Sequence, residues 1–186
     1  SRAALVLFEI TGRNFYLERA QNWTDILNTH FWDEKSGGYF FTADDAEALI
    51  VRSKNAFDNA TPSGNGTMLE VLARLHYLTG EREPFEKATD IVRNFSAELG
   101  RNFFPLATFL NNFETLIDGK QIIIVGKRDD TETGALLSVL SEFSLPTKVI
   151  HIIEDTSGLP SDHPAHGKQQ LENKPTAYVC TGPVCS

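Results

Sequence analysis

The chain is poor in cysteine, in basic residues and in long apolar runs. It has two Cys, and 17 Lys and Arg against 25 Asp and Glu, in 186 residues. Two cysteines do not make a disulfide framework and are typical of a reducing compartment, so we expect a cytoplasmic protein. The net charge of −8 disfavours nucleic acid, which is bound mainly by clustered Lys and Arg. No apolar run approaches the ~20 residues of a membrane-spanning helix, so no membrane contact is expected.

What the chain does contain is a large apolar fraction. Hydrophobic residues make up 41% of it and include 13 Phe, which excludes a disordered chain and provides for a core. The sequence opens on Ser1-Arg2-Ala3 rather than Met, and residues 4–8 already have the pattern of a helix. A trimmed terminus and a piece of a longer protein both explain this start. The internal repeat described next favours the longer protein.

Two stretches of the chain resemble each other at one constant offset. Thr11-Gly12 is followed by Leu17-Glu18-Arg19-Ala20, and Thr79-Gly80 is followed by Phe85-Glu86-Lys87-Ala88. Gly tolerates the left-handed conformation that ends a helix, so each Thr-Gly pair predicts a tight turn between two helices. Apolar residues spaced by three and four then predict an amphipathic second helix in each unit. They are Ala20, Trp23, Ile26 and Leu27 in the first unit, and Ala88, Ile91, Val92 and Phe95 in the second.

The segment between these helical hairpins has a different composition. A turn-forming stretch over 33–38 precedes Tyr39-Phe40-Phe41-Thr42, and an acidic stretch precedes Leu49-Ile50-Val51-Arg52. Aromatic and β-branched residues favour strands, so we predict a β-hairpin inserted between the helices. A further apolar helix is expected from about Pro105 to Ile117.

The pattern changes after Asp118-Gly119. Short apolar runs over 121–126 and 148–153 flank a helical stretch over 131–143, and a third run covers 176–180. Strand, helix and strand in this order predict a βαβ crossover unit. We therefore expect a small three-stranded α/β appendix after the helical region.

The loop over 54–66 carries the strongest sign of a binding site. Pro62 and the two Gly residues enforce a rigid approach to a helix start, and either Ser63 or Asn65 is a suitable N-cap. A helix N-terminus favours anionic or hydroxyl-rich ligands, and Asp58 just upstream is able to accept hydrogen bonds or exchange a proton. An ordinary capped loop explains the same residues.

These segments resemble a family of thioredoxin-domain-containing proteins that includes the spermatogenesis-associated thioredoxin-like proteins and their bacterial relatives. The similarity is carried by Gly37-Gly38-Tyr39-Phe40-Phe41-Thr42, by residues 47–52 and by Asp58 through Asn65. Ala177-Tyr178-Val179-Cys180 with Cys185 is similar to the family's C-terminal motif. The resemblance implies an N-terminal thioredoxin-like domain followed by an (α/α) toroid related to six-hairpin glycosidases and N-acylglucosamine 2-epimerases. This chain, which has no Cys-x-x-Cys motif, matches only the C-terminal part.

The implied fold is mainly α. We expect a partial (α/α) toroid of helical hairpins over 1–118, with the β-hairpin inserted, and the α/β appendix over 119–186. An open arc of a toroid leaves apolar flanks exposed where neighbouring hairpins belong.

The implied site lies on the rim of the toroid cavity, where aromatic faces stack on sugar rings and carboxylates bind hydroxyls. The ligand is then carbohydrate-like, with isomerase and hydrolase chemistry both open. The alternative is a non-catalytic scaffold that presents a client or partner to the thioredoxin-like domain. No cofactor and no metal are expected. The candidate residues are Asp58 and Asp33 for catalysis, and Tyr39, Phe57, Ser63 and Asn65 for substrate binding.

Two weaker motifs lie in the appendix. Cys180 and Cys185 are separated by four residues, unlike the two of thioredoxin-like or zinc-ribbon pairs. Buried or structural thiols are the favoured explanation, while a reversible, redox-active disulfide and a metal pair stay open. His163-Pro164-Ala165-His166 is interpreted as a solvated turn rather than half of a metal site.

Overall fold

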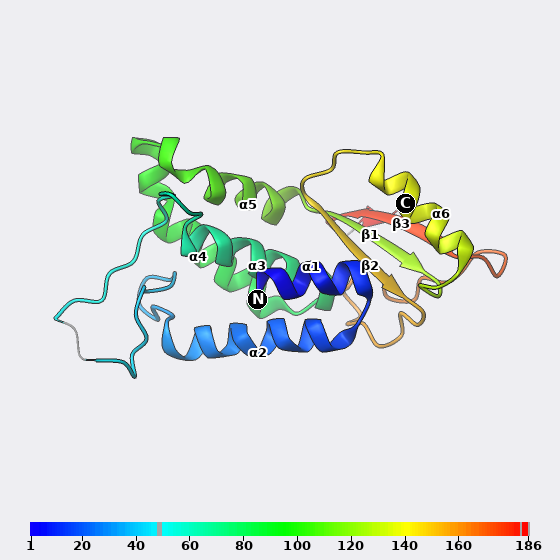
Figure 1. Cartoon of the computed structure of the whole chain (residues 1–186), viewed down its shortest axis with the longest axis horizontal. Coiled ribbons are helices and arrows are strands. Elements are labelled where there is room, and N and C mark those ends of the chain that lie inside the picture. The colour runs from blue at the N-terminus through cyan, green and yellow to red at the C-terminus, as the bar shows by residue number, and fades with distance from the viewer. Residues whose placement is uncertain (48–49, 183, 186) are drawn as a thin grey trace.

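The computed structural model describes residues 1–47, 50–182 and 184–185. Helices fill the first part of the chain and gather at one end of the molecule, while a small sheet with one covering helix forms the other end (Figure 1). This agrees with the predicted mainly-α composition. No described helix is long and apolar enough to cross a membrane. In chain order the elements are α1 (Arg2–Thr11), α2 (Asn14–His30), α3 (Gly64–Thr79), α4 (Arg82–Arg101), a 3-10 turn (Phe104–Leu106), α5 (Ala107–Asp118), β1 (Lys120–Val125), α6 (Thr131–Ser141), β2 (Lys148–Ile153), β3 (Thr176–Thr181) and β4 (Val184–Cys185).

The two predicted helical hairpins are confirmed. Helix α1 packs on α2, and α3 packs on α4. Each first helix ends at the predicted glycine in the left-handed conformation, with φ of 67° at Gly12 and 75° at Gly80. Their N–H groups donate to the carbonyls of Phe8 and His76, which closes both helices. Whether these hairpins continue into a toroid, and whether the chain divides at residue 118, stay predictions.

Helix α3 is the centre of the helical core. It packs against α1, α4 and α5, and its residues Leu69, Leu72 and Leu78 are fully buried. Phe95 of α4 and Phe109 of α5 meet edge to face beside it, with ring centroids 6.1 Å apart. Each such side chain contributes about 1.5–3 kcal/mol by its burial. The loops around the start of α3 are therefore anchored to the most stable part of the fold.

The sheet has the strand order β2-β1-β3-β4. Strands β1 and β2 run parallel and are joined through α6, which confirms the predicted crossover, while β3 pairs antiparallel with β1. Strand β1 is central, and Ile122, Ile123 and Ile124 are buried in it. The described strands number four rather than the predicted three, because β4 is a pair of residues too short to leave a periodic pattern.

The predicted β-hairpin over 39–52 is wrong for the residues that the structure describes, none of which forms a strand there. Tyr39 makes an isolated bridge with Trp32 instead. The Arg52 guanidinium donates two hydrogen bonds to the Thr42 carbonyl, at 2.6 and 3.1 Å, so a side chain occupies an acceptor that a ladder needs. The second predicted strand also included Leu49, which lies outside the described residues.

Candidate functional site

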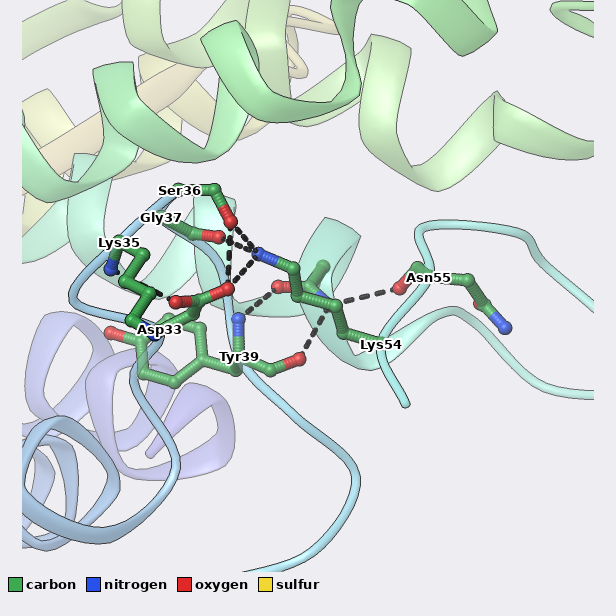
Figure 2. Close-up of polar contacts among 8 residues, drawn as sticks. Asp33, Lys35, Ser36, Gly37, Tyr39, Lys54 and Asn55 are labelled. Atoms are coloured by element: carbon green, nitrogen blue, oxygen red, sulfur yellow. Dashed lines mark hydrogen bonds and ion pairs between the residues drawn. The ribbon is translucent and has the colours of Figure 1, made fainter. Parts of the chain in front are cut away.

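The turn after α2 is held closed by the carboxylate of Asp33. Its Oδ2 atom pairs with Lys54 Nζ at 2.7 Å and accepts from Ser36 Oγ at 2.7 Å, while Oδ1 accepts from the Lys35 N–H at 2.9 Å. Lys54 also donates to Ser36 Oγ and to the carbonyl of Gly37. Figure 2 shows Lys54 reaching across the loop to this turn, so that both carboxylate oxygens of Asp33 and the ammonium group of Lys54 have partners.

These contacts keep Asp33 ionised. Burial by itself raises the pKa of its carboxyl, but the hydrogen bonds from Lys54, Ser36 and Lys35 outweigh burial and hold the pKa well below its usual range. A carboxylate in this state has no proton to donate as a general acid. Its oxygen atoms are also already occupied within the chain.

Asn65 joins the start of α3 to the same loop. Its Oδ1 accepts from the Tyr39 N–H at 2.7 Å, and its Nδ2 donates to the carbonyls of Tyr39 and Asn55, both at 2.9 Å. Asn65 is fully buried. Its amide therefore replaces the backbone partner that Tyr39 would have in a sheet, and it is not the N-cap of the helix.

Tyr39 is part of the core rather than of an open rim. Its hydroxyl donates to Asn28 Oδ1 at 2.6 Å, and its ring meets Trp32 edge to face with centroids 5.0 Å apart. Burial raises the pKa of its phenol above the usual value. A ring enclosed in this way offers no face for a sugar to stack on.

Asp58 links two helix starts. Oδ1 accepts from the Ser63 N–H at 2.8 Å and Oδ2 from the Thr108 N–H at 2.7 Å, while the Asp58 N–H donates to the Pro105 carbonyl. Burial raises the pKa of this carboxyl, but the N–H donors of Thr108 and Ser63 outweigh burial and lower the pKa below its ordinary value. Asp58 thus caps α5 from a distant loop.

The structure places the remaining predicted residues as follows. Ser63 is the N-cap of α3, and its Oγ accepts from the Gly66 N–H at 3.1 Å, as predicted. Phe57 points to solvent and is 43% exposed. No hydrogen bond or ion pair between described groups joins Asp33 to Asp58. The two candidate carboxylates therefore serve separate structural contacts, and their catalytic role stays a prediction.

A polar cavity of about 390 Å³ lies beside the Asp33 turn. Trp32 and Asp33 form one wall, Lys87 and Asp90 of α4 form another, and Lys87 Nζ lies 4.4 Å from the centre of the Trp32 ring. Of the six predicted catalytic and binding residues, Asp33 alone lines it. Sequence reasoning missed Trp32 and Lys87, although Trp32 directly precedes Asp33 in the chain. The rest of the lining includes three further carboxylates and two further cations: Glu34, Glu83, Glu86, Lys35 and Arg93.

One group of side chains elsewhere has the composition of a cation site. His30 Nδ1 lies 2.9 Å from Asp44 Oδ1 and 3.6 Å from Asp45 Oδ2, with the acidic groups exposed. The hydrogen bond to Asp44 raises the pKa of His30. An ion pair between a protonated His30 and Asp44 explains this arrangement without a metal.

Cys180 is buried as expected, but it is joined to Cys185 by a disulfide, so the favoured explanation by thiols is wrong. A redox role for the pair stays a prediction. The two residues face each other in register on β3 and β4, which are paired antiparallel. His163 also differs from expectation, because it is buried and its Nε2 lies 3.1 Å from the Tyr77 carbonyl. The solvated turn predicted for it is wrong, since the loop folds this ring onto α3.

No family model matches the chain. Spermatogenesis-associated protein 20 of Homo sapiens is 32% identical over 193 residues, and the protein of that name in Rattus norvegicus is 31% identical over 193 residues. Both alignments cover the whole of this chain. The chain resembles spermatogenesis-associated protein 20. An uncharacterised protein of Caenorhabditis elegans is 26% identical over 189 residues.

The resemblance is limited by length. The chain spans 24% of the human and rat spermatogenesis-associated protein 20 and 25% of the nematode protein, which is about a quarter in each case. The alignments cover the sequences of both the helical part and the sheet, so each has an aligned segment in those longer proteins. The thioredoxin-like domain and the toroid stay expectations from the sequence.

Proposed function

We propose that this chain is the C-terminal part of a longer protein of the spermatogenesis-associated protein 20 family, and that it is a non-catalytic scaffold. In this proposal its helices continue an (α/α) toroid, which presents a client or partner protein to a thioredoxin-like domain elsewhere in the same protein. The single observation that supports it best is the internal use of the candidate site residues. Asp33, Asp58, Tyr39 and Asn65 each bond groups of their own chain.

The chemistry of those contacts argues against catalysis. Glycoside hydrolysis needs one carboxylic acid that donates a proton and a second carboxylate free to act on the sugar or on water. Both Asp33 and Asp58 have lowered pKa values, and their oxygens accept hydrogen bonds that hold loops in place. A scaffold needs just such fixed loops.

The outer face of α2 supports a continuation of the helical layer. Phe15, Trp23 and Ile26 are exposed there, at spacings that place them along one side of the helix. An exposed apolar helix face of this kind is typical of a contact with another element or protein. A neighbouring helical hairpin, as in a toroid, would cover it.

The scaffold proposal is tested by quantitative pull-down with the longer protein and with a version that lacks these 186 residues. We expect a defined set of partners to be lost with the deletion, while the thioredoxin-like domain stays folded. The same partners recovered at the same yield from both versions would contradict the proposal.

A second candidate is binding of a carbohydrate-like ligand, with hydrolysis or isomerisation as its chemistry. The observation that favours it is the 390 Å³ polar cavity lined by Trp32 and several carboxylates. Titration with a sugar panel, followed by calorimetry, tests it in the wild type and in Trp32→Phe and Asp90→Asn variants, which each change a side chain that lines the cavity. Saturable binding weakened in either variant supports a sugar site, and no binding removes this candidate.

A further inference from the structure

A second cavity, of about 540 Å³, lies where the helical part meets the sheet. In Figure 1 the C-terminal end of α1 lies beside β2 at this junction, and Phe8 of α1 contacts the His151 ring of β2. The volume is within the range of small-molecule sites, about 300–1,000 Å³. None of the residues discussed above as catalytic or substrate-binding lines it. Its apolar wall is built from six side chains: Val6, Ile10, Leu137, Leu145, Pro146 and Ile150.

The charged part of the lining is cationic. Arg74, Arg128 and Lys148 line the cavity together with one carboxylate, that of Glu9. This is unusual in a chain with a net charge of −8. The cavity therefore combines an apolar wall with an excess of positive charge.

Of the three cations that line the cavity, only Arg74 forms ion pairs with carboxylates of the described residues. Arg74 pairs with Glu9 and also, at 3.1 Å, with Glu70. Glu9 uses its second oxygen to accept from the Ile150 N–H at 3.1 Å. Arg74 and Glu9 are thus a closed structural pair that ties α1 and α3 to β2.

The other two cations have no carboxylate partner within residues 1–47, 50–182 and 184–185. Arg128 donates to the Glu9 carbonyl at the end of α1, and Lys148 Nζ donates to the Leu140 carbonyl at 3.2 Å. A carbonyl oxygen positions a cation but does not neutralise it. Each side chain has further N–H donors beyond the single bond that it makes to a carbonyl.

We propose that this cavity binds a small organic anion with an apolar body, of the alkyl or aryl carboxylate class. The carboxylate is bound by Arg128, whose planar guanidinium matches two carboxylate oxygens, with Lys148 as the second cation. The hydrocarbon body lies against Leu137, Leu145 and Ile150, where its burial adds to the affinity. A neutral ligand leaves the two cations uncompensated, and a cationic ligand is repelled by them.

The test is a titration of the ¹⁵N-labelled 186-residue chain with octanoate, octan-1-ol and octylammonium, three molecules with the same hydrocarbon chain and different head charge. We expect octanoate to bind at least about tenfold more tightly than the other two, the size of one charge-assisted hydrogen bond. The shifted amide signals should cluster at 6–10, 126–128, 137, 145 and 147–150. Equal affinity for all three molecules, shifts centred elsewhere, or no binding of octanoate would overturn the proposal.

Variants add a second readout. Arg128→Gln should weaken octanoate binding about tenfold and remove the preference over octan-1-ol. The matched control is Arg82→Gln, which removes a charge from an arginine that is 84% exposed on α4. If Arg128→Gln does not fold, Lys148→Gln makes the same comparison. If folded Arg128→Gln or Lys148→Gln binds octanoate as tightly as the wild type, the proposed site is wrong. It is also wrong if Arg82→Gln weakens octanoate binding by the same factor.

Discussion

The side-chain amide of Asn65 forms both hydrogen bonds of a backbone pair with Tyr39: Oδ1 accepts from the Tyr39 N–H and Nδ2 donates to the Tyr39 carbonyl. The two residues are 26 positions apart, and the contact is buried. A third bond from Nδ2 reaches the Asn55 carbonyl, so one amide holds both ends of the loop that crosses the start of α3. Asn65, which was predicted to bind substrate, therefore holds the segment from Tyr39 to Asn55 against the start of α3.

Asn65→Ala should destabilise the chain severely. The substitution leaves one N–H and two carbonyl groups without their partner in a buried region, and each unsatisfied group costs about 1–3 kcal/mol. We expect a loss of about 3 kcal/mol in the free energy of unfolding, measured by urea denaturation. The control is Asn22→Ala on the exposed side of α2, which should keep wild-type stability. A loss below about 1 kcal/mol for Asn65→Ala would show that the clamp is not needed.

Asp58 should stabilise the fold in a pH-dependent way. Its pKa is lowered in the folded chain, so the ionised form is favoured there more than in the unfolded chain. The stabilisation is complete well above the ordinary pKa of 3.8 and is lost as the pH falls through the lower folded value. Asp58→Asn should therefore cost about 1 kcal/mol at pH 7, as for a lost helix cap, and progressively less below pH 4. Urea denaturation at several pH values measures this, and a difference from wild type that does not shrink with acid contradicts it.

His151 should make the chain less stable in mild acid. Burial, with a smaller contribution from His163, lowers the pKa of His151 from 6.5 to about 4. Between these two values the unfolded chain takes up a proton and the folded chain does not, so stability falls as the pH drops from 6.5 towards 4. By linkage the loss reaches about 3 kcal/mol. His151→Phe keeps a ring against Phe8 and removes the titration, so its stability should depend less on pH in this interval. If the free energy of unfolding falls with pH equally in the variant and in the wild type, the prediction is wrong.

The disulfide should be present in the isolated chain and contribute modestly to stability. Thiol titration in urea should find no free thiol without reductant and two after reduction. Cys180 and Cys185 are five positions apart, and closing so short a loop stabilises by about 2 kcal/mol. A Cys180→Ser/Cys185→Ser double variant should lose about that amount and should not respond to reductant. Two thiols titrating in the oxidised chain would exclude the bond.

The helical part of this fold was predictable because its determinants are local. Thr11-Gly12 and Thr79-Gly80 end helices through the conformation of a single glycine. The apolar spacing after Thr79-Gly80 marks the buried face of α4, but the prediction is wrong for Trp23 and Ile26 of α2, which are exposed. Ser63 was predictable as an N-cap for the same reason, since it lies three residues before the N–H that it accepts from.

The candidate site was less predictable because its contacts are distant in sequence. Nothing near Asp58 in the sequence indicates that its carboxylate receives the N–H of Thr108, 50 residues later. Residues 39–42 have the composition of a strand, but no second strand pairs with them. The Asn65 side chain bonds the backbone of Tyr39 instead, and the Arg52 side chain bonds the carbonyl of Thr42. Side chains that compete with a backbone ladder leave no periodic signal.

We propose that Asp33, Asp58 and Asn65 hold the fold rather than act on a ligand. Urea denaturation of the wild type and of the three alanine variants, each with and without the sugar panel, tests it most directly. We expect the free energy of unfolding of every variant to fall by about 1–3 kcal/mol, and we expect no sugar to raise that of the wild type. Variants as stable as the wild type, together with a sugar that stabilises only the wild type in a saturable way, would contradict it.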